Sequence, residues 1–365
     1  MQLVPEYLGQ LVLAAQNTDY QLPNGIPNDY AMAGLTLTFR GRLTVGVAAI
    51  APSYGAPFSA IERIAVDGQF PKLGQQTIFD LTGRQTLQLN RVFEKKMPYM
   101  DPDNLIVGAG AAAAYDIQFQ LPVPFWAVGM GHGSRRATLC PGNMASNPLR
   151  LIVRRGADVA IGVTGAGSTY AWAAFGGGGA PTVDVTRWKV KQGAVGKGVP
   201  SVLLCKHTRQ GPFATAAAAV DLDIARLNVG NLITRMLLVN GAQYAAAPTE
   251  MTAGTLANLT RIRLKQNSMP MWNFNFRDQH LLGGPDTLSG AYLTAQGPAG
   301  GVGAFALQEM LGECLLDFCP DGNLDDALNT VSWSALGQSL ILNGDITALA
   351  LGEVEVITEE LSRIQ

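Results

Sequence analysis

The stretch at residues 147–163, NPLRLIVRRGADVAIGV, has a counterpart in the C-terminal half of the chain, GQSLILNGDITALAL at residues 337–351. In both stretches an apolar run reaches a break that contains glycine and aspartate, and a second apolar run follows. Such a break between two apolar runs is typical of two strands joined by a short connection. The chain therefore contains the same predicted pair of strands twice.

Three further pairs of short segments repeat in the same order along the chain. Their members lie 197, 198 and 199 residues apart, against 189 for Leu151 and Leu340 in the first pair. Self-similarity at a nearly constant period indicates a repeated structural unit, so we predict two copies of one β-domain in tandem. The pairs are LTLTF at 35–39 with LITRM at 232–236, IERI at 61–64 with LTRI at 259–262, and YDIQF at 115–119 with CLLDF at 314–318.

The composition agrees with two β-domains that bury surface against other chains. A chain of 365 residues is long enough for two domains. Only 15% of residues are charged while 47% are hydrophobic, and the 42 glycines and 20 prolines provide frequent turns. Many short strands with glycine- and proline-rich connections favour a sandwich or barrel. Few charges are typical of interface cores.

The charge pattern excludes some partners. The formal net charge is −2 and the sequence has no basic run, so we expect no direct binding of nucleic acid. No apolar run approaches the roughly 18 residues of a membrane-spanning helix. The four cysteines form no C-x-x-C pair, and we recognise no signal peptide, so we expect buried free thiols in a protein made in a reducing cytoplasm.

The ends of the chain and its middle divide it into three parts. Residues 1–16 predict a short helix that starts near Pro5 and docks on its own domain, a neighbouring subunit or a membrane surface. The two copies would occupy residues 17–177 and 178–365, with the boundary at the run of four glycines, 176–179. Residues 76–92 predict a hairpin that turns at Thr82 and Gly83, and residues 354–365 suggest a terminal helix.

No group of residues predicts a catalytic, cofactor-binding or metal site. His132, His207 and His280 are far apart and share no ligand spacing. Cys205 lies close to His207, but neighbouring side chains of a strand point to opposite faces, which argues against a catalytic pair. The four-glycine run has no following Lys-Ser/Thr and is interpreted as a linker, not a phosphate-binding loop.

Two acidic turns are the remaining candidates for an ion. Asp321 begins a segment that matches the first ligand positions of a calcium loop, but Asp326 and Ser332 stand where that loop has glycine and glutamate. A turn is the preferred interpretation there, and the same holds for the acidic pair at Asp101 and Asp103.

Two tandem β-domains of nearly equal length, few charges and no catalytic set resemble the major coat protein of tailless icosahedral viruses with an inner membrane. Tectiviruses and corticoviruses are examples, and the adenovirus hexon is a distant relative. The resemblance rests on the repeated segments above, which include YDIQFQLPVPF from Tyr115, NPLRLIVRRGAD from Asn147 and LLDFCPDGNLDDALNT from Leu315. It covers most of the chain as a pattern and includes no diagnostic motif.

The resemblance implies an all-β double jelly roll: two tandem eight-stranded jelly rolls with a short N-terminal helix. It also implies a structural protein and not an enzyme. Three chains would form a trimer with a pseudo-hexagonal base, and trimers would tile a virion shell assembled in the host cytoplasm. Partners would be further copies of the chain and minor capsid or penton proteins, and the N-terminal helix could touch an inner viral membrane.

Two other classes of function fit the same sequence. One is a different β-rich virion component, such as a spike, penton or receptor-binding protein, in which equal duplicated halves are less expected. The other is a carbohydrate-active β-sandwich, which would need carboxylates such as Glu313, Asp317 or Asp321 to converge in an aromatic-lined cleft. Aromatic residues make up only 7% of the chain and do not cluster in the sequence, which disfavours that reading.

Overall fold

The structure is a computed structural model of the chain. The described residues are 2–46, 50–52, 57–94, 98–99, 113–128, 135, 137–164, 169–190, 203–214, 219–223, 231–240, 259–266, 269–275, 295–296, 302–303, 313–319, 340–346 and 353–363.

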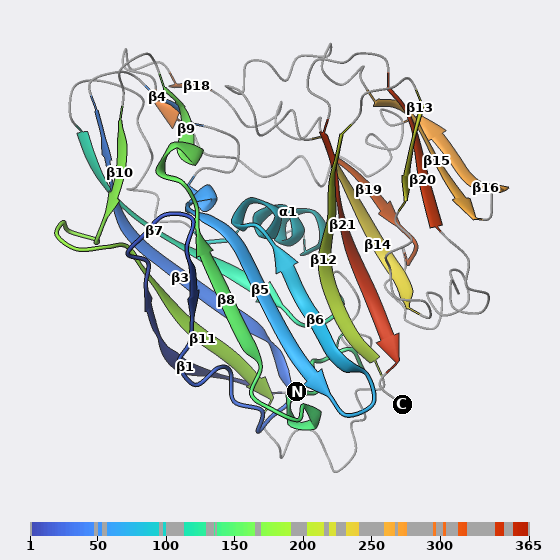
Figure 1. Cartoon of the computed structure of the whole chain (residues 1–365), viewed down its shortest axis with the longest axis horizontal. Coiled ribbons are helices and arrows are strands. Elements are labelled where there is room, and N and C mark those ends of the chain that lie inside the picture. Colours follow the sequence, from blue (N-terminus) through green and yellow to red (C-terminus); the bar gives the residue numbers. More distant parts are fainter. Residues whose placement is uncertain are drawn as a thin grey trace.

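The N-terminal half forms a sandwich of two antiparallel four-stranded layers, the first roll (Figure 1). One layer has the order β1 (Leu3–Val12), β11 (Thr182–Val190), β3 (Met32–Val45), β7 (Ala113–Pro124). The other layer has the order β2 (Asp19–Gln21), β8 (Arg150–Arg155), β5 (Ile61–Phe70), β6 (Gly74–Leu81).

The C-terminal half repeats this arrangement as the second roll. One layer has the order β12 (Leu203–Ala214), β21 (Glu353–Arg363), β14 (Leu232–Asn240), β19 (Glu313–Asp317). The other layer has the order β13 (Ala219–Asp223), β20 (Leu340–Ile346), β15 (Leu259–Gln266), β16 (Met269–Asn275).

Strands that hold the same place in the two rolls are called cognate here. In each roll the first described strand pairs with the last, the last pairs with the third, and the layers are crossed in the same sequence. The prediction of two tandem eight-stranded jelly rolls is therefore confirmed for the described strands. All four sequence repeats fall on cognate strands, which are β3 and β14, β5 and β15, β7 and β19, and β8 and β20.

Shorter strands and 3-10 turns are added to the two rolls. The described ones are β4 (Ile50–Pro52), β9 (Gly162–Thr164), β10 (Tyr170–Ala173), β17 (Ala295–Gln296), β18 (Val302–Gly303) and the 3-10 turns η1 (Phe58–Ala60), η3 (Gly142–Met144) and η4 (Asp158–Ile161). The strand β10 extends the first layer by pairing with the end of β3, and β4 pairs with β9.

A helix, α1 (Gly83–Glu94), follows β6 where the sequence predicted the second arm of a hairpin. That prediction was wrong because the residues at Thr82 and Gln85 cap a helix, and this local signal overrides the alternation of TLQLNRV. The Gln85 main-chain N–H donates to Thr82 Oγ1 at 3.1 Å, and the Thr82 N–H donates to Gln85 Oε1 at 2.9 Å. This reciprocal pair is a capping box. Gly83 is required there, because a Cβ would lie 2.2 Å from the carbonyl oxygen of Phe58.

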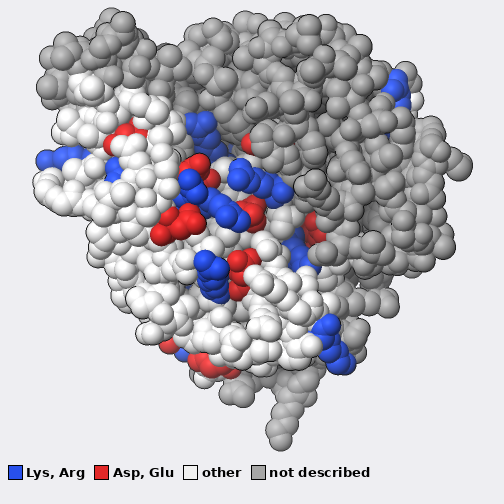
Figure 2. Space-filling model, viewed as in Figure 1, with Lys and Arg blue, Asp and Glu red and all other residues white. Residues whose placement is uncertain are grey.

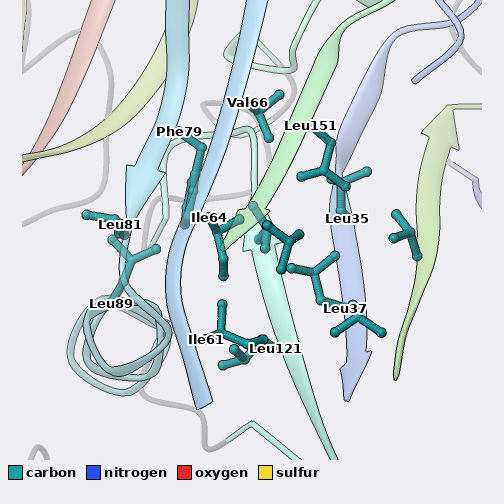
Figure 3. Packing of buried hydrophobic residues seen from close by; sticks show 14 of the residues in the cluster. Leu35, Leu37, Ile61, Ile64, Val66, Phe79, Leu81, Leu89, Leu121 and Leu151 are labelled. Atoms are coloured by element: carbon teal, nitrogen blue, oxygen red, sulfur yellow. The ribbon is translucent and has the colours of Figure 1, made fainter. Parts of the chain in front are cut away.

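The largest core fills the first roll and reaches the second. In β3, Leu35, Leu37 and Phe39 point between the layers and are at most 1% exposed, while the residues between them carry threonine. Figure 3 shows Leu35 and Leu37 facing side chains of β5, β6 and β8, with Leu121 of the neighbouring β7 beside them and Leu89 of α1 at one side. This alternation is the pattern of a strand that is buried on one face.

The two rolls are joined through one of these layers. The strand β6 pairs in parallel with β12, at Phe79 with His207 and at Asp80 with Thr208, so eight strands form one continuous sheet. Figure 1 shows α1 beside this junction, at one end of β6 and β12. The polar groups described below lie at the same junction.

Both predicted terminal helices are strands. Residues of β1 pair with β11 from Leu3 to Val12, with a bulge before Gly9, and β21 is hydrogen-bonded on both sides, by β12 and β14. The apolar residues of each segment fit the period of a helix as well as that of a strand. Pairing with neighbouring strands of a sheet decides in favour of the strand. The predicted contact of an N-terminal helix with a membrane loses its basis. Among the described residues, no helix has the length and hydrophobicity needed to cross a bilayer.

The four-glycine run at 176–179 lies between β10 and β11, and all four residues have positive φ. Positive φ favours glycine, which explains the run as a turn. The following strand, β11, lies between β1 and β3 in the first roll. The strand pairing thus favours a boundary after Val190 over the boundary predicted at residue 177.

Candidate functional site

The most distinctive chemistry of the described residues is a polar cluster buried where the rolls meet. Glu359 stands in β21, the central strand of its layer, with His207 of β12 opposite it on one side and Arg235 of β14 on the other. All three side chains are at most 4% exposed. Charged groups are rarely buried so completely unless they are paired.

Hydrogen bonds from both rolls satisfy the Glu359 carboxylate. Thr234 Oγ1 donates to Oε1 at 2.6 Å, and His207 Nε2 lies 3.1 Å from Oε2. The main-chain N–H of Val128 also donates to Oε2, at 2.6 Å. Val128 follows β7 and belongs to the first roll, so Glu359 links the two rolls directly.

The Arg235 guanidinium completes the same link. Its Nε donates to Asp317 Oδ2 at 3.0 Å, and one Nη lies 3.5 Å from Glu359 Oε1. The same group donates to the main-chain oxygen of Val128. Both main-chain polar atoms of Val128 are thus held by charged side chains of the second roll, and such charge-assisted hydrogen bonds are stronger than neutral ones.

The electrostatics favour an ionised carboxylate in this dry environment. Burial by itself would raise the pKa of Glu359, but the hydrogen bond from His207 and the positive charge of Arg235 outweigh it, and the pKa lies below its ordinary value. In Arg235, burial opposes the charged form, while Glu359 and Asp317 hold the pKa above its ordinary value. The cluster therefore behaves as a buried ion pair.

Cys205 also reaches this cluster, contrary to the sequence argument. Cys205 and His207 are two positions apart in β12, and residues two apart in a strand share a face. The Cys205 sulfur lies 3.9 Å from His207 Nε2. A Cys, a His and a Glu together suggest a catalytic triad, but burial raises the pKa of Cys205 well above its ordinary value. A protonated thiol without access to solvent is not a nucleophile.

The same three groups have the donor types of a zinc site. One ligand atom from each of Cys205, His207 and Glu359 lies within 4.8 Å of the other two. The carboxylate already accepts hydrogen bonds from Val128, Thr234 and His207, and the Arg235 cation beside it repels a second cation. We interpret the cluster as structural.

Further contacts extend the junction on either side of the cluster. Lys206 Nζ donates to Gln76 Oε1 of β6 at 2.5 Å, and Gln85 of α1 donates to Glu355 of β21. Ala127 packs against an apolar group from the second roll. That group comprises Leu203, Cys205, Leu232, Cys319 and Leu361.

Several of the other candidates from the sequence cannot be placed. His132, His280, Asp101, Asp103 and Asp321 lie outside the described residues. Cys140, Cys205 and Cys319 are buried free thiols, as predicted for them. Of the carboxylates proposed for a carbohydrate-active site, Asp317 is paired with Arg235 in the cluster.

Figure 2 shows acidic and basic side chains interspersed on one face of the molecule, without a continuous basic patch among the coloured residues. The first roll has partly exposed ion pairs between Arg63 and Asp80 and from Arg154 to Glu62 and Asp19.

Two solved structures that resemble this one over its full length are of viral proteins. No protein-family model matches the sequence, and no curated protein matches it. The MCP of STIV, the Sulfolobus turreted icosahedral virus, aligns over 100% of this chain and 97% of its own, with a TM-score of 0.64 and 12% identity. The major capsid protein of bacteriophage PM2 aligns over 99% of this chain and 98% of its own, with a TM-score of 0.56 and 11% identity.

Each of these alignments spans both rolls, and each solved chain is almost completely covered. The likeness agrees with the duplicated strand order and with the eight-stranded sheet that joins the rolls. This chain has the double jelly-roll fold of viral major capsid proteins.

Proposed function

We propose that this chain is the major capsid protein of an icosahedral virus, and that three copies form a pseudo-hexameric capsomer that tiles the virion shell. Similarity of fold over the full length of two capsid proteins carries the proposal. The role is structural and not enzymatic. Its place is the virion capsid, assembled in the host cytoplasm, with other trimers and minor or penton proteins as neighbours.

The junction between the rolls supports this role physically. A capsomer built from three chains has six similar positions only if the two rolls of each chain keep a fixed relation to each other. The buried link from Val128 to Glu359 and Arg235, together with the parallel pairing of β6 and β12, fixes that relation. Partly satisfied buried charges are costly, so the charged groups favour one alignment of the rolls.

We divide the chain into two domains according to the pairing of its strands. The first roll runs from β1 to β11 and the second from β12 to β21, with residues 191–202 between them. Each roll then contains a complete set of cognate strands. Limited proteolysis with identification of the cut sites tests this division, and a first cleavage between Val190 and Leu203 is the expected result.

Light scattering of the purified native chain tests the trimer. Three chains of 38.6 kDa give an expected mass of about 116 kDa. Incubation at rising protein concentration, followed by electron microscopy, then tests tiling, for which sheets or shells of six-sided units are expected. A monomer over the whole concentration range contradicts the trimer. A trimer that never associates further favours a spike, penton or receptor-binding protein.

A further inference from the structure

The two rolls differ in how their cognate layers are covered. In the second roll, residues 232–239 of β14 are buried without a break, so both faces of that strand are covered. In β3, the cognate strand, buried residues alternate with partly exposed ones such as Thr36 and Arg40. The extra covering of β14 comes from the first roll, because Val128 binds Arg235. Among the described residues, no segment covers the corresponding face of the first roll in this way.

Strand registers identify which residues correspond. In the first roll, Asp184 of β11 stands opposite Gln10 of β1 and Thr38 of β3. In the second roll, Glu359 stands opposite His207 and Arg235. Thr38 and Arg235 are 197 residues apart, which is the spacing of the repeat on these strands. Asp184 is therefore the counterpart of Glu359, and Gln10 is the counterpart of His207.

The uncovered face carries a similar row of polar groups. Gln10 Nε2 donates to Asp184 Oδ1 at 2.9 Å, and Arg40 donates to the other oxygen of Asp184. Arg40 Nε also donates to Gln118 Oε1 of β7 at 3.1 Å. An acid in the last strand and an arginine in the third strand thus recur in both rolls. In the first roll this row lies at the surface.

The same face also carries exposed apolar surface in the part of the chain that the structure describes. Tyr7 is 61% exposed, and its register opposite Thr186 makes it the counterpart of Cys205, which is fully buried against the first roll. A hollow of about 380 Å³ adjoins this face, lined by Leu3, Thr36, Pro122, Trp126 and Trp188 among others. Exposed aromatic surface beside such a hollow is typical of a contact site.

We propose that the face formed by β1, β11, β3 and β7 is the docking surface for the second roll of a neighbouring copy of this chain. This inference rests on the proposed function and names its trimer contact. The neighbour would present the side that contains β16, the cognate of β6, because β6 is the strand that joins the second roll within the chain. The contact is head to tail, and three such contacts close a ring.

Introducing two arginines on this face and measuring the molecular mass of the particle tests the inference. Tyr7→Arg with Gln10→Arg adds bulk and charge to the docking surface, and the folded chain tolerates both because each lies beside Asp184. Light scattering should show a loss from about 116 kDa to the 38.6 kDa monomer. Val159→Arg is the matched control, since Val159 is 67% exposed outside this face and its replacement should leave the trimer intact.

Photo-crosslinking keeps the test independent of the variant's folding. A benzoylphenylalanine in place of Tyr7 should crosslink in the trimer to peptides of the neighbour's second roll. A persistent trimer in the double arginine variant, or crosslinks that join Tyr7 only to first-roll peptides, overturns the docking surface and leaves the trimer standing. A wild-type chain that stays monomeric overturns both the surface and the proposed function.

Discussion

The main-chain N–H of Val128 donates to the Glu359 carboxylate at 2.6 Å, so a charge buried in the last strand of the second roll is stabilised partly by a hydrogen bond from the first roll. The two residues are 231 positions apart. Contacts so distant in sequence form only when both rolls are in place, so the stability of each roll depends on the other.

Replacing Glu359 by glutamine should destabilise the chain strongly. The change keeps the shape of the side chain but leaves Arg235 and His207 without their anion in a site with no solvent. Removal of one partner of a buried ion pair costs about 3–5 kcal/mol in the free energy of unfolding. Urea unfolding followed by fluorescence measures the difference.

The matched control is Glu62→Gln on the outside of the first roll. Glu62 pairs with Arg154 at 2.9 Å, but its side chain is 47% exposed. Surface ion pairs contribute about 0–1 kcal/mol. Equal losses in the Glu359 and Glu62 variants would show that the buried link does not hold the rolls together.

The Glu359 carboxylate should make the stability of the protein sensitive to acid. The pKa of Glu359 is lower in the folded chain than its ordinary value of 4.5, so its contribution to stability is present above pH 4.5 and is lost as the pH falls below it. Asp116 adds to this at lower pH, because the hydrogen bond from Arg42 lowers its pKa to about 2. Unfolding free energies between pH 7 and 3 should fall with pH, and less steeply for Glu359→Gln. The same slope in both proteins would exclude Glu359 as a source of the effect.

Removing the capping box should weaken α1. In Thr82→Ala the N–H of Gln85 loses its acceptor, and such a loss costs about 0.5–2 kcal/mol in the free energy of unfolding. Thr82→Ser keeps the hydroxyl and should behave nearly as the wild type. Thermal unfolding followed by circular dichroism compares the three proteins. An alanine variant as stable as the serine variant would contradict the role of this cap.

Three cysteines should resist modification in the native protein. Burial raises the pKa of Cys140 to about 12, and Cys205 and Cys319 are also buried. Because only an accessible thiolate reacts, iodoacetamide should leave these three unlabelled until denaturant is added. Peptide mass spectrometry measures the extent of labelling at each cysteine separately. Rapid labelling of Cys205 under native conditions would contradict its place against the first roll.

The duplicated fold could be predicted because the repeats reflect physical constraints on particular strands. Leu35, Leu37 and Phe39 alternate with polar residues, and their counterparts in β14 keep the same place in the sheet. The terminal strands were missed because short apolar segments fit a helix or a strand, and pairing with distant partners decided between them. For α1, the local signal was present at Thr82 and Gln85, and the alternation of the following residues masked it.

The polar cluster could not be predicted from spacing along the chain. Glu359, Arg235 and Asp317 come together through pairing between strands, which no local pattern specifies. One contact of the cluster could be predicted from the sequence, because Cys205 and His207 are two positions apart in a strand and must share a face. The role of Val128 had no sequence signal, because only its main-chain atoms take part.

Electron microscopy of the purified native protein tests the central claim most directly. If the chain is a double jelly-roll coat protein, the averaged images should show trimeric particles with a six-sided outline, in which six similar lobes alternate between first and second rolls. Particles with one pair of lobes, or trimers with a plainly three-lobed outline, would contradict the account.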